Sequence, residues 1–179
     1  MGKWGSCDFR QLRDLQKKME KLQQHDYDAF CRAAAKDLAA RLLAKVIRRT
    51  PVGKTINGEQ GTEHMGGTLR RGWTARTEQE AESGTNKNPA QYAQSLRITK
   101  TGNVYQIEII NPVHYASYVE YGHRQQPGRF VPAIGKRLKA GWVKGRFMLT
   151  ISEQELQAQA PVLLEKKLMK FLGECFDGN

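Results

Sequence analysis

The chain has 179 residues, 39% of them hydrophobic, a length and composition that suit one domain over residues 1–179 with a modest core. No apolar run approaches the roughly 18 residues that a membrane-spanning helix needs, so we expect no membrane segment and no membrane partner. The formal net charge of +11 favours a polyanionic partner, either nucleic acid or an acidic protein surface.

Residues 8–49 are predicted to be helical. Asp8 and Gln11 have the spacing of a capping box, and an apolar seam with alternating spacings of three and four follows, as in a helix that lies against another helix. This seam consists of Leu12, Leu15, Met19 and Leu22. An Ala-rich segment then continues to Thr50, where Pro51 ends it because Pro disfavours helical geometry in the preceding residue. Asp26 also fits an N-cap, so the pattern allows one helix or two.

Residues 68–111 are predicted to form a small antiparallel sheet of about three to four strands. The segment TLRRGWTARTEQ at 68–79 alternates like a strand, with Leu69 and Trp73 on the same side. SLRIT and VYQIEII indicate a hairpin, because KTGN between them supplies turn residues that accept positive φ. Asn111 and Pro112 end the second strand, and VHYASYVEY is predicted to be a short helix closed by Gly122.

Residues 122–150 are predicted to form an extended basic arm. Between residues 121 and 152 there is no Asp or Glu, and aromatic residues are interleaved with Arg and Lys. A solvated surface loop is the simplest interpretation, but aromatic residues and Arg are enriched at interfaces and long loops are often functional. The residues that we expect to make contacts with partners are Arg124, Arg129, Phe130, Lys136, Arg137, Lys139, Trp142, Lys144 and Arg146.

A C-terminal helix is predicted over residues 152–174. Ser152 and Glu155 have capping-box spacing, and Pro161 is expected to kink or divide the helix. Grouped strands with helices outside them indicate an α+β fold, in which long N-terminal and C-terminal helices pack on one face of a small antiparallel sheet.

Signatures of chemistry are weak. PVGKT at 51–55 resembles the end of a phosphate-binding loop, but Arg48 stands where the first Gly is needed and a helix precedes it. Glu120 and His123 have the spacing of a carboxylate–histidine metal pair, but only one such pair is present. The three cysteines are widely spaced without a CxxC pair, which favours reduced thiols. We expect no catalytic residues, no cofactor and no metal.

Three segments together resemble a known family. TPVGKT with GGTLRRGW, then NPVHYASYVEYGHR, then PGRFVPA are similar to the tail-component family of tailed bacteriophages, over about residues 26–135. The residues that carry this resemblance as a structural motif are Pro51, Trp73, Tyr115, Tyr118, Glu120 and Gly122. The chain departs from the simplest members by its extra N-terminal helical stretch and by the long insertion KRLKAGWVKGRFMLTISEQEL before the last helix. This longer form resembles the version found in contractile-tailed phages and phage-tail-like particles.

The resemblance implies a structural protein of the virion neck, assembled in the host bacterial cytoplasm. It implies a ring, expected to be hexameric, that acts in tail completion or tail termination between the tail and the head connector. Expected partners are further copies of the chain and neighbouring connector, tail-tube or sheath proteins. The helix at 113–121 would pack its aromatic residues on the sheet and set the direction of the arm. The arm would reach a neighbouring protein, or its cations would line the lumen through which DNA passes.

Two other functions remain open at this stage. A free nucleic-acid-binding protein would use the basic arm, although the sequence shows no helix-turn-helix, RNP or zinc-binding pattern. A nuclease would need a carboxylate site, and no pattern in the sequence indicates one.

Overall fold

The computed structural model describes residues 13–14, 16–17, 19–20, 27–53, 56–57, 63–64, 66–132 and 135–177. The capping box at Asp8 and Gln11, and the choice between one N-terminal helix and two, depend on residues outside this description.

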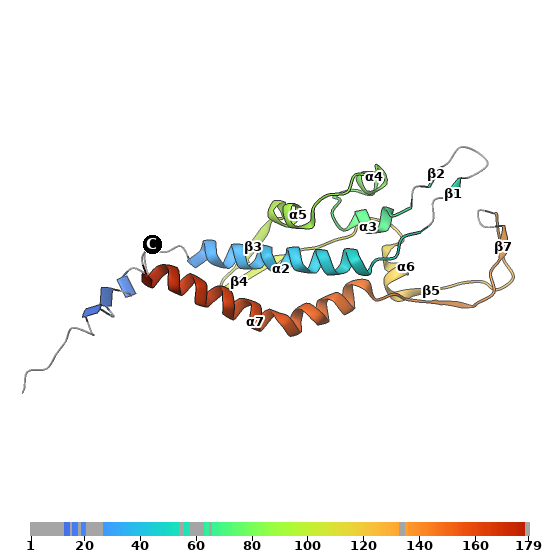
Figure 1. The fold of residues 1–179 in the computed structure, drawn as a ribbon. Coiled ribbons are helices and arrows are strands. Elements are labelled where there is room, and N and C mark those ends of the chain that lie inside the picture. The colour runs from blue at the N-terminus through green and yellow to red at the C-terminus, as the bar shows by residue number, and fades with distance from the viewer. Residues whose placement is uncertain are drawn as a thin grey trace, which may run out of the picture.

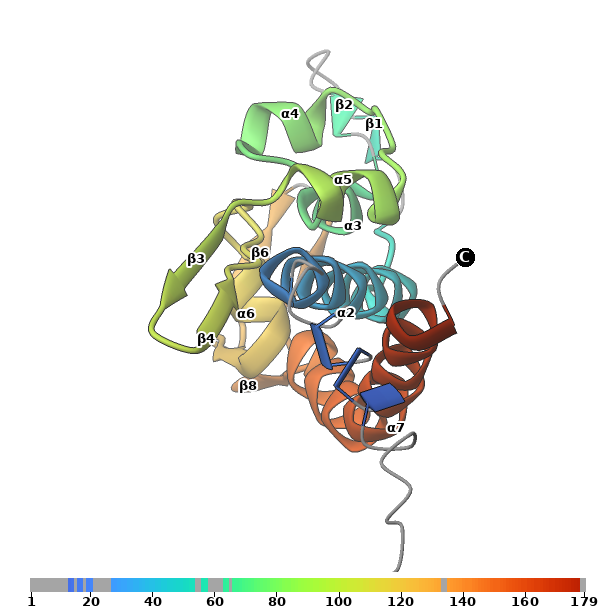
Figure 2. The same cartoon turned by 90° about the vertical axis from the view of Figure 1, so that its left-hand side faces the viewer.

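The fold is organised around helix α2 (Tyr27–Arg49). Figure 2 looks nearly along this helix and shows it at the centre, with the long C-terminal helix α7 (Met148–Asp177) on one side. Ion pairs join the two helices, because Glu155 on α7 accepts from both Lys45 (3.1 Å) and Arg49 (2.5 Å) on α2. Arg48 and Arg49 occupy the last turn of α2, where cations suit the helix dipole. The α+β class with long helices near both ends of the chain is therefore confirmed.

Three short helices cover the other side of α2, as Figure 2 shows. They are α3 (Thr68–Gly72), α4 (Glu78–Glu82) and α5 (Pro89–Ser95). Thr77 caps α4 by accepting the Glu80 amide, and Asn88 caps α5 by accepting the Ala90 amide, with Pro89 in the first turn.

The strand predicted at residues 68–79 is wrong, because α3 occupies its first half. Leu69 and Trp73 are four residues apart, a spacing that fits both a strand face and a helix face. The structure uses the helical alternative: Leu69, Gly72 and Trp73 are all buried on one side, and the Arg71 amide closes the turn on the Gly67 carbonyl at 3.0 Å.

The described strands form four separate antiparallel pairs of two strands each, not one sheet of three or four. The predicted hairpin is confirmed as β3 (Ile98–Thr101) and β4 (Val104–Ile107), which turn at Gly102 with φ 59°. A second pair consists of β1 (Ile56–Asn57) and β2 (Glu63–His64). The other two pairs lie in the basic arm.

The short helix expected before Gly122 is confirmed as α6 (Ala116–Tyr121). Its packing differs from the prediction. Of its aromatic neighbours only Tyr115 packs against the core, whereas Tyr118 and Tyr121 are 56% and 62% exposed. Glu120, on the same helix, is buried.

Helix α7 begins four residues before its predicted start. The capping box at Ser152 is wrong, since Ser152 is buried inside the helix and its Oγ donates to the Met148 carbonyl at 2.6 Å. The helix continues through Pro161 to Asp177, and Figure 1 shows its axis bending near the middle. A kink agrees with the missing amide hydrogen of Pro161, whereas a division of the helix does not occur.

The hydrophobic core lies where α2, α3 and the start of α7 meet. Its most deeply buried large side chains are Leu43, Val46 and Met148, and Leu69, Trp73 and Val113 pack against them. This core holds the segment before α6 in place and so positions the base of the arm.

Candidate interface: the basic arm, its base and a nearby cleft

The basic arm is a long two-stranded hairpin that runs from Gly122 to Phe147. At its base β5 (Gly122–Arg124) pairs with β8 (Trp142–Lys144), and at its tip β6 (Phe130–Val131) pairs with β7 (Lys136–Arg137). Backbone bonds from Gln125 to Gly141, and between the segments at Gly128–Arg129 and Leu138, connect the two ladders. Figure 1 shows the hairpin standing off the body of the molecule. An extended arm is therefore present, and it is held together by its own backbone hydrogen bonds.

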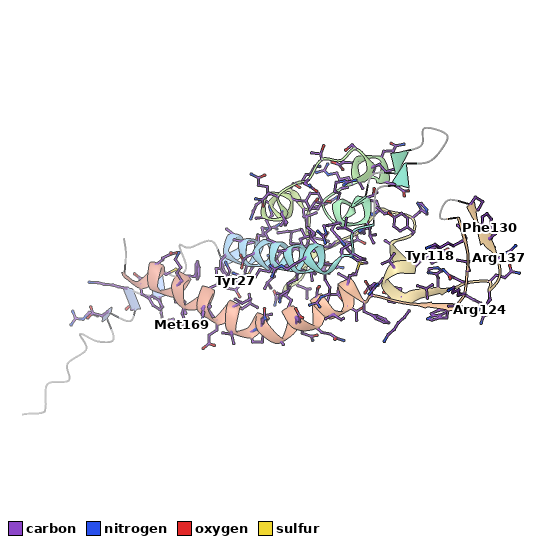
Figure 3. All side chains as sticks on the ribbon, turned by 45° about the vertical axis from the view of Figure 1, so that its right-hand side comes forward. Tyr27, Tyr118, Arg124, Phe130, Arg137 and Met169 are labelled. Carbon is purple, nitrogen blue, oxygen red and sulfur yellow. The ribbon has the colours of Figure 1, made fainter. Side chains whose placement is uncertain are left out.

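The arm presents cations and aromatic rings to the outside. All nine residues expected to make contacts are exposed; they are Arg124, Arg129, Phe130, Lys136, Arg137, Lys139, Trp142, Lys144 and Arg146. The side chains of Phe130 and Trp142 are 51% and 57% exposed. Each lies opposite an arginine across the ladder, Phe130 opposite Arg137 and Trp142 opposite Arg124. Figure 3 shows Arg124, Phe130 and Arg137 together on this projection.

The arm cations form no ion pair with other described residues. The ion pairs in that part of the chain join α2 to α7 and to β3, lie within α2 or α7, or pair Glu80 with Lys87 and Glu78 with His114. The Arg137 guanidinium donates to the Gly128 carbonyl at 2.8 Å, within the arm itself. The positive charge of the arm therefore faces solvent or a partner.

The base of the arm is built on the carboxylate of Glu120, which is 5% exposed. It accepts hydrogen bonds from the Leu149 amide (3.0 Å), the Thr150 amide (2.9 Å) and the Thr150 hydroxyl (2.8 Å). These amides belong to the first turn of α7, where the backbone lacks internal partners and the helix dipole favours an anion. Glu120 thus caps α7 across 29 residues of sequence.

Two glycines let the backbones at this base come together. A Cβ on Gly122, whose φ is 87°, would lie 2.4 Å from the Val143 carbonyl oxygen, and a Cβ on Gly145 would lie 2.3 Å from the Glu120 carbonyl oxygen. The Arg146 and Phe147 amides donate to the Val119 and Glu120 carbonyls at 2.8 and 3.0 Å. The end of α6, both arm strands and the start of α7 therefore form one fixed junction, and this junction sets the direction of the arm.

A second junction joins the Thr50–Pro51 turn to α3. The indole nitrogen of Trp73 donates to the Thr50 hydroxyl at 2.8 Å, and this hydroxyl donates to the Val46 carbonyl at 2.7 Å. Arg70 donates to the Thr50 carbonyl at 2.7 Å. Both Thr50 and Trp73 are buried, so these bonds stabilise the end of α2 against α3.

Asn111 extends the same frame towards α6. Its side-chain amide donates to the Leu69 carbonyl at 2.8 Å and its oxygen accepts from the Val113 amide at 3.2 Å. Gly72 lies directly against it, since a Cβ there would be 2.2 Å from the Asn111 side-chain oxygen. Trp73, Glu120 and Gly122 thus make structural contacts. Sequence reasoning named Thr50 and Asn111 only as the ends of a helix and of a strand, and it missed Gly145.

A cleft of about 540 Å³ opens between the Thr50–Pro51 turn, α3 and α6. Its apolar lining includes Val52, Leu69, Tyr115 and Val119, and Glu82 and His114 also line it. No sequence pattern indicated this cleft, because four separate segments build it: residues 51–53, residues 66–69, Glu82 and residues 114–119.

Charges of both signs surround the cleft, because the Arg71 guanidinium donates to the Gly66 carbonyl at 3.0 Å and to the Ala81 carbonyl at 2.7 Å, next to Glu82. The His114 ring is paired with Glu78 at 2.5 Å, and this holds the pKa of the Glu78 carboxyl below its usual range. Burial raises the pKa of Tyr115, and the nearby carboxylates of Glu78 and Glu82 raise it further. In the part of the chain that the structure describes, Glu82 takes part in no ion pair.

Two other features bear on chemistry. Glu120 and His123 do not converge as metal ligands, because the Glu120 carboxylate is engaged by α7. Over the described ranges there is no cluster of three or more His, Cys, Asp or Glu side chains suited to a metal ion. No helix in these ranges combines the length and apolar character needed to cross a membrane.

The residues that build this frame match a known family. The family described as "Bacteriophage HK97-gp10, putative tail-component" matches residues 13–122, more than half of the chain. The chain belongs to this family of phage tail components. Comparison with curated proteins and with solved structures finds no match.

Family membership confirms the resemblance and indicates a structural protein of the phage tail. It therefore implies a location in the virion and contact with other virion proteins. The matched region ends at Gly122, the first residue of β5. The arm and helix α7 follow the family region and are attached to it through Glu120 and the junction around Gly122.

Proposed function

We propose that this tail component is a neck protein that acts in tail completion or tail termination. In this proposal it forms a ring, expected to be hexameric, where the tail meets the head connector. The observation that carries the proposal is the hairpin arm at the end of the family region. Its cations form no ion pair with other described residues and three of its aromatic rings are exposed, and such a surface is typical of an interface with a partner.

The ring brings the arm next to its partners. Further copies of the chain lie beside it, and connector, tail-tube or sheath proteins lie above and below. Cations that face the lumen contact DNA transiently as it passes. We place the protein in a contractile-tailed phage or a phage-tail-like particle, and its assembly in the host cytoplasm. Neither a cofactor nor a catalytic step is part of this function.

Electron microscopy of particles from a producing strain that lacks the gene tests the proposal. Filled heads beside separate tails of normal length are the result expected of tail completion, and tails of irregular, overgrown length are the result expected of tail termination. Restoring the gene in trans must restore joined particles. If the deletion strain makes normal infectious particles, the neck function is refuted.

The exposed arm cations also support a second function, direct nucleic-acid binding outside the virion. Binding through phosphate contacts would weaken by about one power of salt concentration for each contact. Replacing Arg129 and Arg137 by Ala would then reduce this salt dependence. If the protein does not bind DNA at low salt, or binds it equally at all salt concentrations, this second function is excluded.

A further inference from the structure

We propose that the N-terminal segment of one copy, residues 8–22, docks on an open apolar face of helix α7 in a neighbouring copy. The apolar seam of the segment covers the apolar side chains of the face. This inference rests on the proposed ring and names a contact that joins its subunits.

The second half of α7 has one side packed and the other open. On the packed side Phe171 stacks on Phe30 of α2, with the ring centroids 4.6 Å apart. With about 3.6 residues per turn, the apolar residues of the open side fall on one face together with half-buried Leu172 and with Glu165. Figure 3 shows Met169 on the side of α7 that is turned away from α2. The large apolar residues of this face are 37–65% exposed, and they are Val162, Leu164, Leu168 and Met169.

The N-terminal segment has a pattern that fits such a face. Its apolar seam at 12–22 has alternating spacings of three and four, the pattern of a helix that lies against another helix. The described residues between 13 and 20 are helical, and Gln16 donates to Glu20 one turn further on at 3.0 Å. Met19 is the seam residue that the structure describes, and it is 56% exposed. At Met19 the seam is therefore open in the single chain.

The two surfaces also agree in length. An α-helix rises about 1.5 Å per residue, so a helical seam from Leu12 to Leu22 is about 15 Å long. Val162 and Leu172 bound the face of α7 and are separated by the same number of residues. Charges of both signs occur in both segments, so the burial of apolar surface, rather than charge, favours the contact.

The position of the segment points to a neighbouring copy rather than to its own α7. The chain enters α2 at Tyr27, close to the C-terminal end of α7, because Phe30 contacts Phe171 there. Figure 1 shows the described parts of the segment, in dark blue, beyond this end of α7 and leading away from the body. All described residues between 13 and 20 are exposed. The segment and the face are different surfaces, so the contact is head-to-tail and closes into a ring where the rotation between copies permits.

Disulfide trapping tests the contact. Two full-length chains with tags of different size, one carrying Met19→Cys and the other Met169→Cys, are mixed and oxidised. Both also carry Cys7→Ser, because this native thiol is close to the segment in the sequence. A disulfide forms only where the Cβ atoms approach to about 4 Å, so it reports docking. We expect the mixed dimer to form several-fold faster than in a control mixture in which Val104→Cys replaces Met169→Cys. Val104 and Met169 are both 65% exposed, so the two thiols are matched in access.

A second substitution distinguishes the chain that supplies the face from the chain that supplies the seam. Leu168→Gln should reduce the trapping rate several-fold in the Met169→Cys chain and leave it unchanged in the Met19→Cys chain, whose face is not used. Leu15→Gln, which disrupts the seam, should show the opposite dependence. Lys170→Gln is the matched control on α7, since this exposed side chain lies off the face, and it should leave the rate unchanged in either chain.

Trapping no faster than with the Val104→Cys control overturns the inference. So does a chain carrying both Met19→Cys and Met169→Cys that closes a disulfide only within itself, because the segment then covers its own α7. If the deletion strain gives unjoined heads and tails but trapping fails, the neck function stands and this contact is wrong. If trapping succeeds while the deletion strain makes normal particles, the contact between copies stands and the neck function is wrong.

Discussion

Replacing Glu120 tests whether the family region stabilises helix α7 through a single buried carboxylate. In the structure this carboxylate accepts three hydrogen bonds, two of them from amides in the first turn of α7. Loss of a helix cap costs about 1 kcal/mol, and loss of an anion at a helix N-terminus costs up to about 1 kcal/mol more. Glu120→Ala should therefore lower the free energy of unfolding by about 2 kcal/mol. Glu120→Gln keeps one acceptor oxygen, so it should cost about half as much.

Urea denaturation followed by circular dichroism measures this change as a shift in the midpoint at constant slope. Glu153→Ala, an exposed change on the same helix, is the control and should stay within about 0.5 kcal/mol of the parent. A double-mutant cycle of Glu120→Gln with Thr150→Ala should show coupling, because the two side chains share a hydrogen bond of 2.8 Å. The capping argument is refuted if Glu120→Ala is no more destabilising than Glu153→Ala.

Three further predictions concern the junctions. Gly122→Ala should lower the free energy of unfolding, measured by urea denaturation, by about 1–3 kcal/mol, because φ 87° with ψ 172° is accessible almost only to Gly. Gly102→Ala is the control and should lower it less, because a Cβ at Gly102 would meet open space. Trp73→Phe should cost about 2 kcal/mol by removing the bond to the buried Thr50 hydroxyl, whereas Thr50→Ser should keep most of the stability. Hydrogen bonds from Lys45 and Arg49 lower the pKa of the Glu155 carboxyl from its usual 4.5. The stabilisation by this carboxylate should therefore be present above pH 4.5 and be lost as the pH falls towards the lower pKa of the folded state. Glu155→Gln should reduce the acid-induced fall in melting temperature.

Much of the architecture could be predicted because its signals are local. Pro51 ends α2, the KTGN turn forms the β3–β4 hairpin, and Gly122 closes α6 with a positive φ. The basic arm was predicted from residues 121–152, which contain seven cations and no carboxylate. Motif residues at Thr50, Trp73 and Glu120 also indicated the family, since each takes part in a junction that the fold requires.

The sequence by itself determined these local elements, the family and the charge of the arm, because each depends on neighbouring residues or on composition. Only the tertiary structure decided that residues 68–72 are helical, since the spacing of Leu69 and Trp73 fits either period and the packing of Gly72 on Asn111 selects the helix. It likewise decided where α7 begins, because the cap is Glu120 from another segment rather than Ser152. The cleft arises in the same way, from residues that are distant in sequence and meet only when α3, α4 and α6 pack together.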